Sequence, residues 1–139
     1  MMNGYGLSFH HFGLAVRTPV RAVHFAGALG YNLSAPLLDV SQNVNLIWCT
    51  HPSMPAIEII FPTETAGPLA SVLQKSDSLI YHLCYECSDI GQSIENMIGG
   101  GERVVQIVPP TPAPLFDGRE VAFVLIKGFG VVELVRASS

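Results

Sequence analysis

The chain has 139 residues, of which 49% are hydrophobic and 13% charged, and its formal net charge is -4. This balance provides a sizeable core and excludes a disordered chain. Only seven Lys and Arg residues occur, without a cluster, which excludes nucleic acid as a partner. No segment approaches the ~18 apolar residues of a membrane span, and no secretory signal is visible. With three cysteines in no framework spacing, we expect a cytoplasmic protein that does not bind membranes.

The first half of the chain opens with a strand and a helix. Ser8–Arg17 is rich in aromatic and aliphatic residues, which predicts a strand carrying His11. Thr18 fits the N-cap of a helix that runs to about Leu29, and Gly30 fits its C-terminal cap.

Three further strands are predicted in this half, over Tyr31–Leu38, Val44–Thr50 and Ala56–Phe61. The last of them carries Glu58 inside a β-prone run, where an unpaired buried carboxylate would be costly. The stretch Pro68–Lys75 then predicts a short linking helix.

The second half follows the same order of elements. His82 lies in its first strand and Glu133 in its last. The predicted elements are a strand over Leu79–Cys87, a helix over Ile90–Ile98, a strand over Glu102–Val108, a proline-rich loop over Pro109–Gly118, and strands over Arg119–Ile126 and Val131–Arg136.

An internal repeat relates the two halves. His11 and His82 are 71 positions apart, and so are Gly30 and Gly101, the glycines that close the two predicted helices. A fixed offset of this kind is typical of a duplicated unit.

The repeat predicts the architecture. We expect one α+β domain over residues 1–139, built from two pseudo-symmetric βαβββ modules. Module one is 8–62, the linker is 63–78, and module two is 79–136.

Two such modules would bring His11, Glu58, His82 and Glu133 to a common centre. A lone histidine in an apolar strand is more often a satisfied core residue, but a matching His and Glu in both halves favours a metal site. Imidazole and carboxylate ligands suit divalent Co, Ni, Zn, Mn or Fe. Such an ion can polarise a carbonyl and stabilise an enolate while a carboxylate takes the α-proton.

Other polar residues have structural interpretations. His24 and His51 are expected to face solvent, Asp39–Gln42 is interpreted as a polar turn, and Trp48 as a core residue.

Several stretches, in order along nearly the whole chain, resemble the vicinal oxygen chelate (glyoxalase/bleomycin resistance/dioxygenase) superfamily. Within it they are most similar to methylmalonyl-CoA epimerases. The stretches are HHFGLAV (His10–Val16), Gly30–Tyr31, QNV (Gln42–Val44), IEIIFP (Ile57–Pro62), GPLASVL (Gly67–Leu73), YHLCYECSDI (Tyr81–Ile90), DGREVAFV (Asp117–Val124) and VVELV (Val131–Val135).

The resemblance implies a cupped mixed sheet around one divalent metal ion, with His11, Glu58, His82 and Glu133 as ligands. It also implies a small acyl thioester as substrate and a homodimer, since many relatives are dimers. Among the site carboxylates, Glu133 is the first candidate for the catalytic base and Glu58 the second.

The chain departs from the epimerase pattern at three places. Epimerases often have glutamine where Glu58 stands, whereas glyoxalase I has glutamate. Ser41 occupies the position of an acid implicated as one of two bases. The family's His-Pro-Lys-like stretch, near the acyl-CoA end of the pocket, is replaced by LIKGFG (Leu125–Gly130).

The resemblance therefore favours a metal-dependent isomerase or epimerase that acts through an enolate of a small acyl thioester. One alternative is a glyoxalase I-type lyase acting on a thiol adduct of a 2-oxoaldehyde. Another is a non-catalytic, ligand-sequestering protein of the resistance type, although such proteins usually lack the complete set of four ligands.

Overall fold

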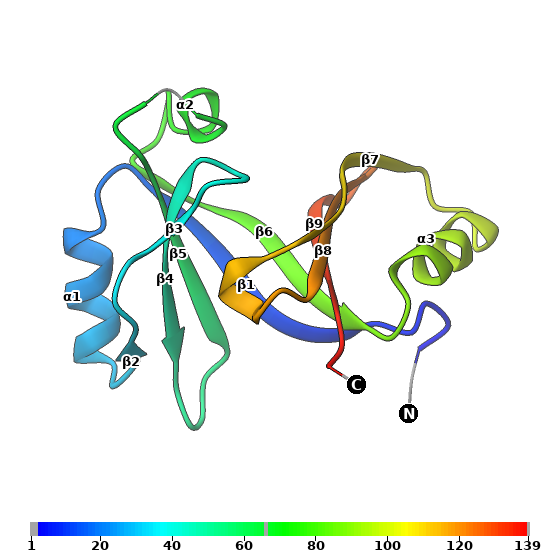
Figure 1. Cartoon of the computed structure of the whole chain (residues 1–139), viewed down its shortest axis with the longest axis horizontal. Helices are drawn as coiled ribbons and strands as arrows, with labels where there is room; N and C mark the ends of the chain where they lie inside the picture. The colour runs from blue at the N-terminus through cyan, green and yellow to red at the C-terminus, as the bar shows by residue number, and fades with distance from the viewer. Residues whose placement is uncertain (1–2, 66, 139) are drawn as a thin grey trace. The chain divides into compact units, whose positions relative to one another are not determined.

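Apolar strands and short helices build an α+β fold with mixed sheets, which confirms the predicted fold class (Figure 1). The computed structural model describes residues 3–65 and 67–138. The chain divides into two compact units. The first unit is His11–Tyr81, and the second unit combines Met1–His10 with His82–Ser139.

In the first unit, the sheet order is β2-β4-β5-β1, and β3 also pairs with β4. β1 and β5 are parallel, whereas the other pairs are antiparallel. The strands are β1 (Ser8–Val16), β2 (Asn32–Leu33), β3 (Leu37–Asp39), β4 (Val44–Thr50) and β5 (Ala56–Pro62).

Helix α1 (Val20–Ala28) packs on one face of this sheet through Ala26. Alternate residues of the central strands, including Ile47, Cys49 and Ile59, fill the core beneath it. The residues between them point to the other face, because successive side chains of a strand alternate. Trp48 and Glu58 lie on that opposite face.

Two predictions for the first unit were wrong. The strand predicted over Tyr31–Leu38 breaks after Leu33, because Pro36 has no N–H to donate to the ladder. At the break, the Ser34 hydroxyl accepts a hydrogen bond from the backbone N–H of Trp48. The N-cap of α1 is Pro19 rather than Thr18, and no side chain caps this helix.

In the second unit, the sheet order is β6-β9-β8-β7, with α3 packed on one face. β6 and β9 are parallel, and the remaining pairs are antiparallel. The Asp89 side chain caps α3 by accepting from the backbone N–H of Gln92. The elements are β6 (Ser78–Cys87), α3 (Ile90–Gly99), β7 (Val104–Pro112), a 3-10 turn (Pro114–Phe116), β8 (Glu120–Ile126) and β9 (Gly130–Arg136).

The proline-rich stretch of this unit is only partly a loop. β7 continues to Pro112, with two register shifts between Gln106 and Thr111. It ends the sheet order of the unit, and an edge strand tolerates prolines because one side of its backbone needs no donors. The prediction of a loop from Pro109 to Gly118 was therefore wrong for its first residues.

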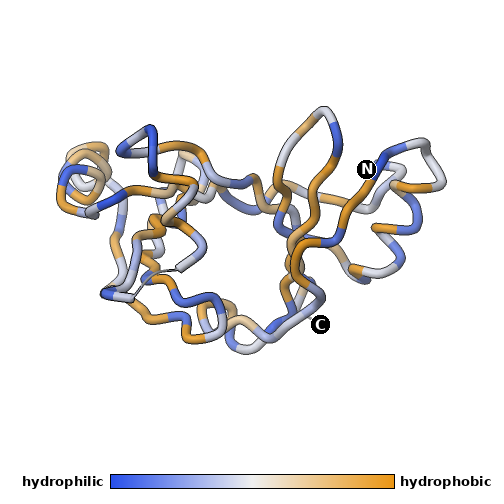
Figure 2. Tube along the Cα trace, turned by 90° about the horizontal axis from the view of Figure 1, so that it is seen from above, coloured by the Kyte–Doolittle hydropathy of each residue, from blue (hydrophilic) through white to orange (hydrophobic). Residues whose placement is uncertain are grey.

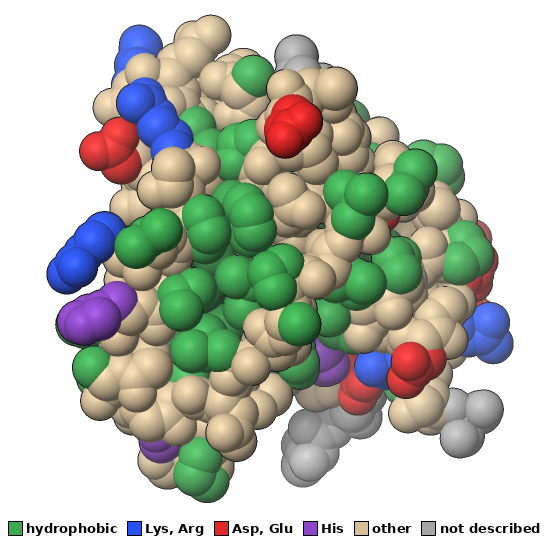
Figure 3. Space-filling view, turned by 60° about the vertical axis from the view of Figure 1, so that its left-hand side comes forward, with side chains coloured by type: hydrophobic (Ala, Val, Ile, Leu, Met, Phe, Trp, Pro, Cys, Tyr) green, Lys and Arg blue, Asp and Glu red, His purple; other side chains and the backbone are tan. Residues whose placement is uncertain are grey.

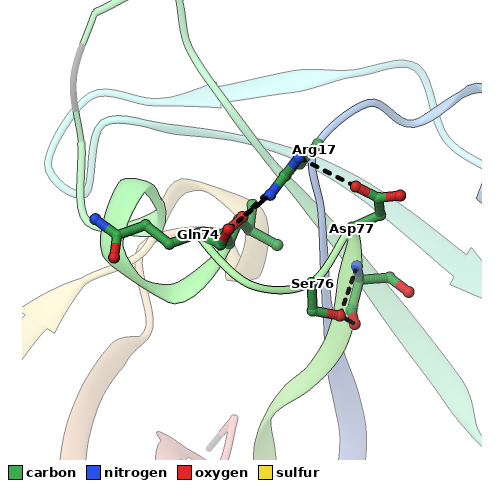
Figure 4. Close-up of polar contacts among 6 residues, drawn as sticks. Arg17, Gln74, Ser76 and Asp77 are labelled. Atoms are coloured by element: carbon green, nitrogen blue, oxygen red, sulfur yellow. Dashed lines mark hydrogen bonds and ion pairs between the residues drawn. The ribbon is translucent and has the colours of Figure 1, made fainter.

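Arg17 anchors the segment that follows β5 to the end of β1 (Figure 4). Its guanidinium donates to the backbone carbonyls of Leu73, at 2.9 Å from Nε, and of Gln74, at 3.1 Å. The same guanidinium lies 3.2 Å from the Asp77 carboxylate. The helix in this segment, α2 (Leu69–Val72), is shorter than the predicted Pro68–Lys75.

Replacing Arg17 with alanine should loosen this segment. We expect faster amide hydrogen exchange in residues 69–77 and a loss of about 1 kcal/mol in the free energy of unfolding, since the bonds are charge-assisted but half-exposed. Arg21→Ala, on the exposed surface of α1, is the matched control. Equal exchange in the two variants would show that Arg17 does not anchor the segment.

Hydrophobic residues also reach the surface. Figure 2 shows hydrophobic and hydrophilic segments interspersed along the trace. The face in Figure 3 carries a broad area of hydrophobic side chains bordered by charged groups. Large exposed apolar residues of the first unit are Val20, Phe25, Leu29, Leu38, Val40 and Ile80. Such a surface suits a second copy of the chain, and the homodimer stays a prediction.

None of the helices in the described part of the chain has the length and apolar character needed to span a membrane.

Candidate metal centre

The second unit holds one histidine and one glutamate side by side. β6 and β9 are parallel neighbours in which Cys84 faces Glu133, and His82 lies two residues before Cys84 on the same face. His82 Nε2 is 3.0 Å from Glu133 Oε1, and the two side chains are 1% and 3% exposed.

The first unit contains a second pair of the same kind. β1 and β5 are parallel neighbours in which Gly13 faces Glu58, and His11 lies two residues before Gly13. His11 Nε2 is 4.0 Å from Glu58 Oε1, and both side chains are buried. Each pair therefore has a histidine displaced by two residues from the position opposite its glutamate.

An aromatic ring completes each pair. Phe123 faces Glu133 across β8 and β9, and its ring meets the His82 imidazole edge-to-face at 5.3 Å. Trp48 faces Glu58 across β4 and β5, and its ring meets the His11 imidazole edge-to-face at 5.0 Å. These contacts restrict the orientation of both imidazoles.

The sequence does not predict this role of the two aromatic residues. Its pattern predicts Trp48 as a core residue, and Phe123 is not among the predicted site residues. The signal was present in the spacing, because Trp48 lies ten positions before Glu58, and Phe123 ten positions before Glu133.

The donor atoms of each pair fit a divalent ion. Ligand atoms bound at about 2.1 Å and at right angles are about 3 Å apart, which matches the separation in the His82–Glu133 pair. The 4.0 Å in the His11–Glu58 pair corresponds to a wider angle at such an ion. Burial suits this role as well, because a buried carboxylate needs a cation or hydrogen-bond donors.

The connector before β4 is held by a buried carboxylate. Asp39 is 1% exposed and accepts from the Ser41 hydroxyl at 2.7 Å and from the Gln42 side-chain amide at 3.0 Å. It also accepts from the Gln42 backbone N–H at 3.2 Å. The polar turn expected here is thus organised by Asp39, and the Ser41 hydroxyl is engaged as a donor.

The remaining histidines lie outside these pairs. His10 meets Phe116 edge-to-face at 5.4 Å, and His24 is exposed on α1 as expected. His51 does not simply face solvent, because its Nε2 lies 3.0 Å from the Leu29 carbonyl at the end of α1.

All three cysteines are buried, and they form no disulfide within the described part of the chain. Burial raises the pKa of Cys49 from 9.0, the ordinary value for a thiol, to about 11, and burial is also the main cause that raises the pKa of Cys87. Both thiols are therefore protonated near neutral pH and act as apolar packing groups.

The raised pKa of Cys49 has a consequence for alkaline stability. The folded chain holds this proton more tightly than the unfolded chain, so the stabilisation is complete below pH 9 and is lost as the pH rises to about 11. We expect the free energy of unfolding, measured in urea, to fall more steeply over this range for the wild type than for Cys49→Ala. If the free energy of unfolding falls equally with pH in the wild type and in Cys49→Ala, the raised pKa of Cys49 is contradicted.

Comparison with known proteins identifies the family. The sequence model of the Glyoxalase/Bleomycin resistance protein/Dioxygenase superfamily matches residues 10–123. The chain belongs to this superfamily. It is 30% identical over 129 residues to the ethylmalonyl-CoA/methylmalonyl-CoA epimerase of Cereibacter sphaeroides, covering 90% of this chain and 94% of the relative.

Solved structures share the fold at lower identity. Methylmalonyl-CoA epimerase from Mycobacterium tuberculosis aligns with a TM-score of 0.72 and 21% identity, covering 96% of this chain and 89% of that one. The Streptomyces coelicolor methylmalonyl-CoA epimerase in complex with 2-nitronate-propionyl-CoA aligns with a TM-score of 0.74 and 17% identity, covering 94% and 97%.

Proposed function

We propose that the protein is a metal-dependent epimerase that removes and returns the proton α to the carbonyl of a small acyl-CoA thioester. The observation that carries the proposal is the group of histidine, glutamate and aromatic ring that occurs once in each unit. The 30% identity to an ethylmalonyl-CoA/methylmalonyl-CoA epimerase over most of both chains supports this reaction.

In this proposal, His11, Glu58, His82 and Glu133 hold one divalent ion, which is Co, Ni, Zn, Mn or Fe. Such an ion supplies a Lewis acid that stabilises negative charge developing on a carbonyl oxygen. The side chains around each pair keep it away from water, which strengthens electrostatic interactions.

Glu133 is proposed as the group that accepts the α-proton, and Glu58, the second carboxylate, as the group that returns a proton to the opposite face of the enolate, which inversion at the α-carbon requires. It is a carboxylate in a buried position, and its neighbour His82 lies 3.0 Å away. With an ion bound at the four residues, Glu133 would have to leave the ion in order to accept the proton. Ser41 is not proposed as a base, because its hydroxyl donates to Asp39.

The experiment is a solvent-deuterium exchange screen on the metal-loaded protein. Methylmalonyl-CoA, ethylmalonyl-CoA and propionyl-CoA would be incubated in deuterated buffer and followed by mass spectrometry. We expect deuterium at the α-carbon of at least one malonyl-type thioester, and none after removal of the metal with a chelator. A metal-loaded protein that exchanges no thioester would refute the proposal.

Glu58 favours a second candidate reaction. Epimerases often carry glutamine at this position, whereas glyoxalase I carries glutamate, as this chain does. The same preparation would be assayed with the adduct of methylglyoxal and glutathione. Conversion of this adduct, without exchange of thioesters, would assign a glyoxalase I-type lyase activity.

A further inference from the structure

The second unit contains a cavity of about 440 Å³. Val132 lines this cavity and Glu133 is the next residue of β9, so the Glu133 side chain points to the opposite face of the sheet. Tyr85 also lines it, and the neighbouring Cys84 faces Glu133. The cavity is therefore separate from the His82–Glu133 pair, and its volume is typical of small-molecule sites.

The floor of the cavity is apolar. Met97, Ile126 and Val132 are 3%, 7% and 2% exposed and belong to the core under α3. Tyr85 and Leu7 add half-buried walls. The sulfur of Met97 and the ring of Tyr85 are favourable neighbours for an aromatic group.

The N-terminal segment forms one wall and is fixed in place. The Asn3 side chain accepts from the backbone N–H groups of Tyr5 and Leu7, each at 3.1 Å. Tyr5 packs closely on the end of α3, because a Cβ at Gly100 would meet its hydroxyl at 2.8 Å. The Tyr5 hydroxyl donates to Glu102 Oε2 at 3.3 Å.

Opposite charges stand at the rim. The backbone N–H of Lys127 donates to the carbonyl of Arg103 at 3.0 Å. Arg103 follows Glu102 in the chain, so this bond brings the backbone of Lys127 next to that of Glu102. Both Lys127 and Glu102 line the cavity. Among the described residues, none forms an ion pair with Lys127, and the Glu102 carboxylate has one side-chain partner, the Tyr5 hydroxyl.

We propose that this cavity binds a zwitterionic α-amino acid with an apolar, preferably aromatic, side chain. The carboxylate of the ligand pairs with Lys127 and its ammonium with Glu102, while its side chain contacts the apolar floor. An anion alone would be repelled by Glu102, and a cation alone by Lys127. A zwitterion satisfies both rim charges through charge-assisted hydrogen bonds.

Titration calorimetry with L-phenylalanine tests the proposal. We expect saturable binding with a Kd of about 1 mM or tighter. N-acetyl-L-phenylalanine, which lacks the ammonium, and 2-phenylethylamine, which lacks the carboxylate, should each bind about tenfold more weakly, a difference of about 1.4 kcal/mol. Equal affinity for the amino acid and its N-acetyl derivative would overturn the proposal.

Variants assign the two charges. Lys127→Gln should weaken L-phenylalanine about tenfold without weakening 2-phenylethylamine, whereas Glu102→Gln should weaken both. Arg103→Gln is the matched control, because Arg103 is exposed and does not line the cavity. Circular dichroism would verify that each variant is folded. Because Lys127 is exposed, Lys127→Gln is expected to leave the fold intact, so this variant by itself tests the contact with the carboxylate of the ligand.

The binding is independent of the proposed epimerase reaction. The titration would be run on metal-loaded and metal-stripped protein, with the same affinity expected in both. Competition between coenzyme A and L-phenylalanine would contradict the proposal, because it would assign the cavity to the thioester instead. The absence of saturable heat would also refute it, and neither result would bear on α-proton exchange.

Discussion

Glu133→Gln is expected to abolish nearly all α-proton exchange while the protein stays folded and keeps some metal. Glutamine has nearly the same shape as glutamate and can still offer an oxygen to an ion, but it cannot accept the proton. A positioned general base contributes about 10²–10⁴-fold to a rate, so exchange should fall by about that factor. The measurement is deuterium incorporation into the active thioester, with metal content determined on the same sample.

Ser41→Ala is the matched control for this experiment. Its hydroxyl donates to Asp39 at 2.7 Å, so its loss leaves Asp39 with the two bonds from Gln42. Exchange should stay within a few-fold of the wild type. Exchange that survives Glu133→Gln but vanishes in Ser41→Ala would move the base to the connector before β4.

The sequence predicted most of the fold because the chain is duplicated. The offset between His11 and His82 predicted two units with the same order of elements. The structure places these histidines on β1 and β6, and Glu58 and Glu133 on β5 and β9. The parallel pairing of β1 with β5 and of β6 with β9 explains why residues about fifty positions apart become neighbours. The module boundaries at 62 and 79 stay predictions.

Features that depend on tertiary contacts were not predictable. The break between Leu33 and Leu37 arises from Pro36, yet Ser34 bridges it by a hydrogen bond to Trp48 that local sequence does not reveal. Pro109 and Pro110 predict a loop, because the sequence does not reveal that β7 is the last strand in the sheet order of its unit. An edge strand accepts prolines that a central strand would exclude.

The roles of the two aromatic residues were hidden for a different reason. A tryptophan or phenylalanine in a strand normally indicates core packing, and composition alone cannot distinguish this from contact with a histidine. The antiparallel register, which pairs Trp48 with Glu58 and Phe123 with Glu133, decides the contact. Only a comparison of the two halves position by position could have indicated it.

One divalent ion per chain is expected, and its loss should follow from damage to either unit. If His11, Glu58, His82 and Glu133 share one ion, His11→Gln in the first unit and His82→Gln in the second should each reduce bound metal from one ion per chain to nearly none at micromolar metal. Each would also abolish exchange, because both units then contribute to the same centre. Metal content by mass spectrometry and the shift of the unfolding temperature on adding metal measure this, since an ion that binds only the folded state stabilises it in proportion to ln(1 + [L]/Kd).

A metal content of two ions per chain would contradict the shared site. Two independent sites, one in each unit, would give two ions per chain in the wild type and one ion in either variant. His24→Gln is the matched control, because His24 lies exposed on α1, outside both pairs, and should leave the metal content unchanged. Retention of one ion in either His11→Gln or His82→Gln would show that the two pairs do not share a centre, and the proposed four-ligand site would then be wrong.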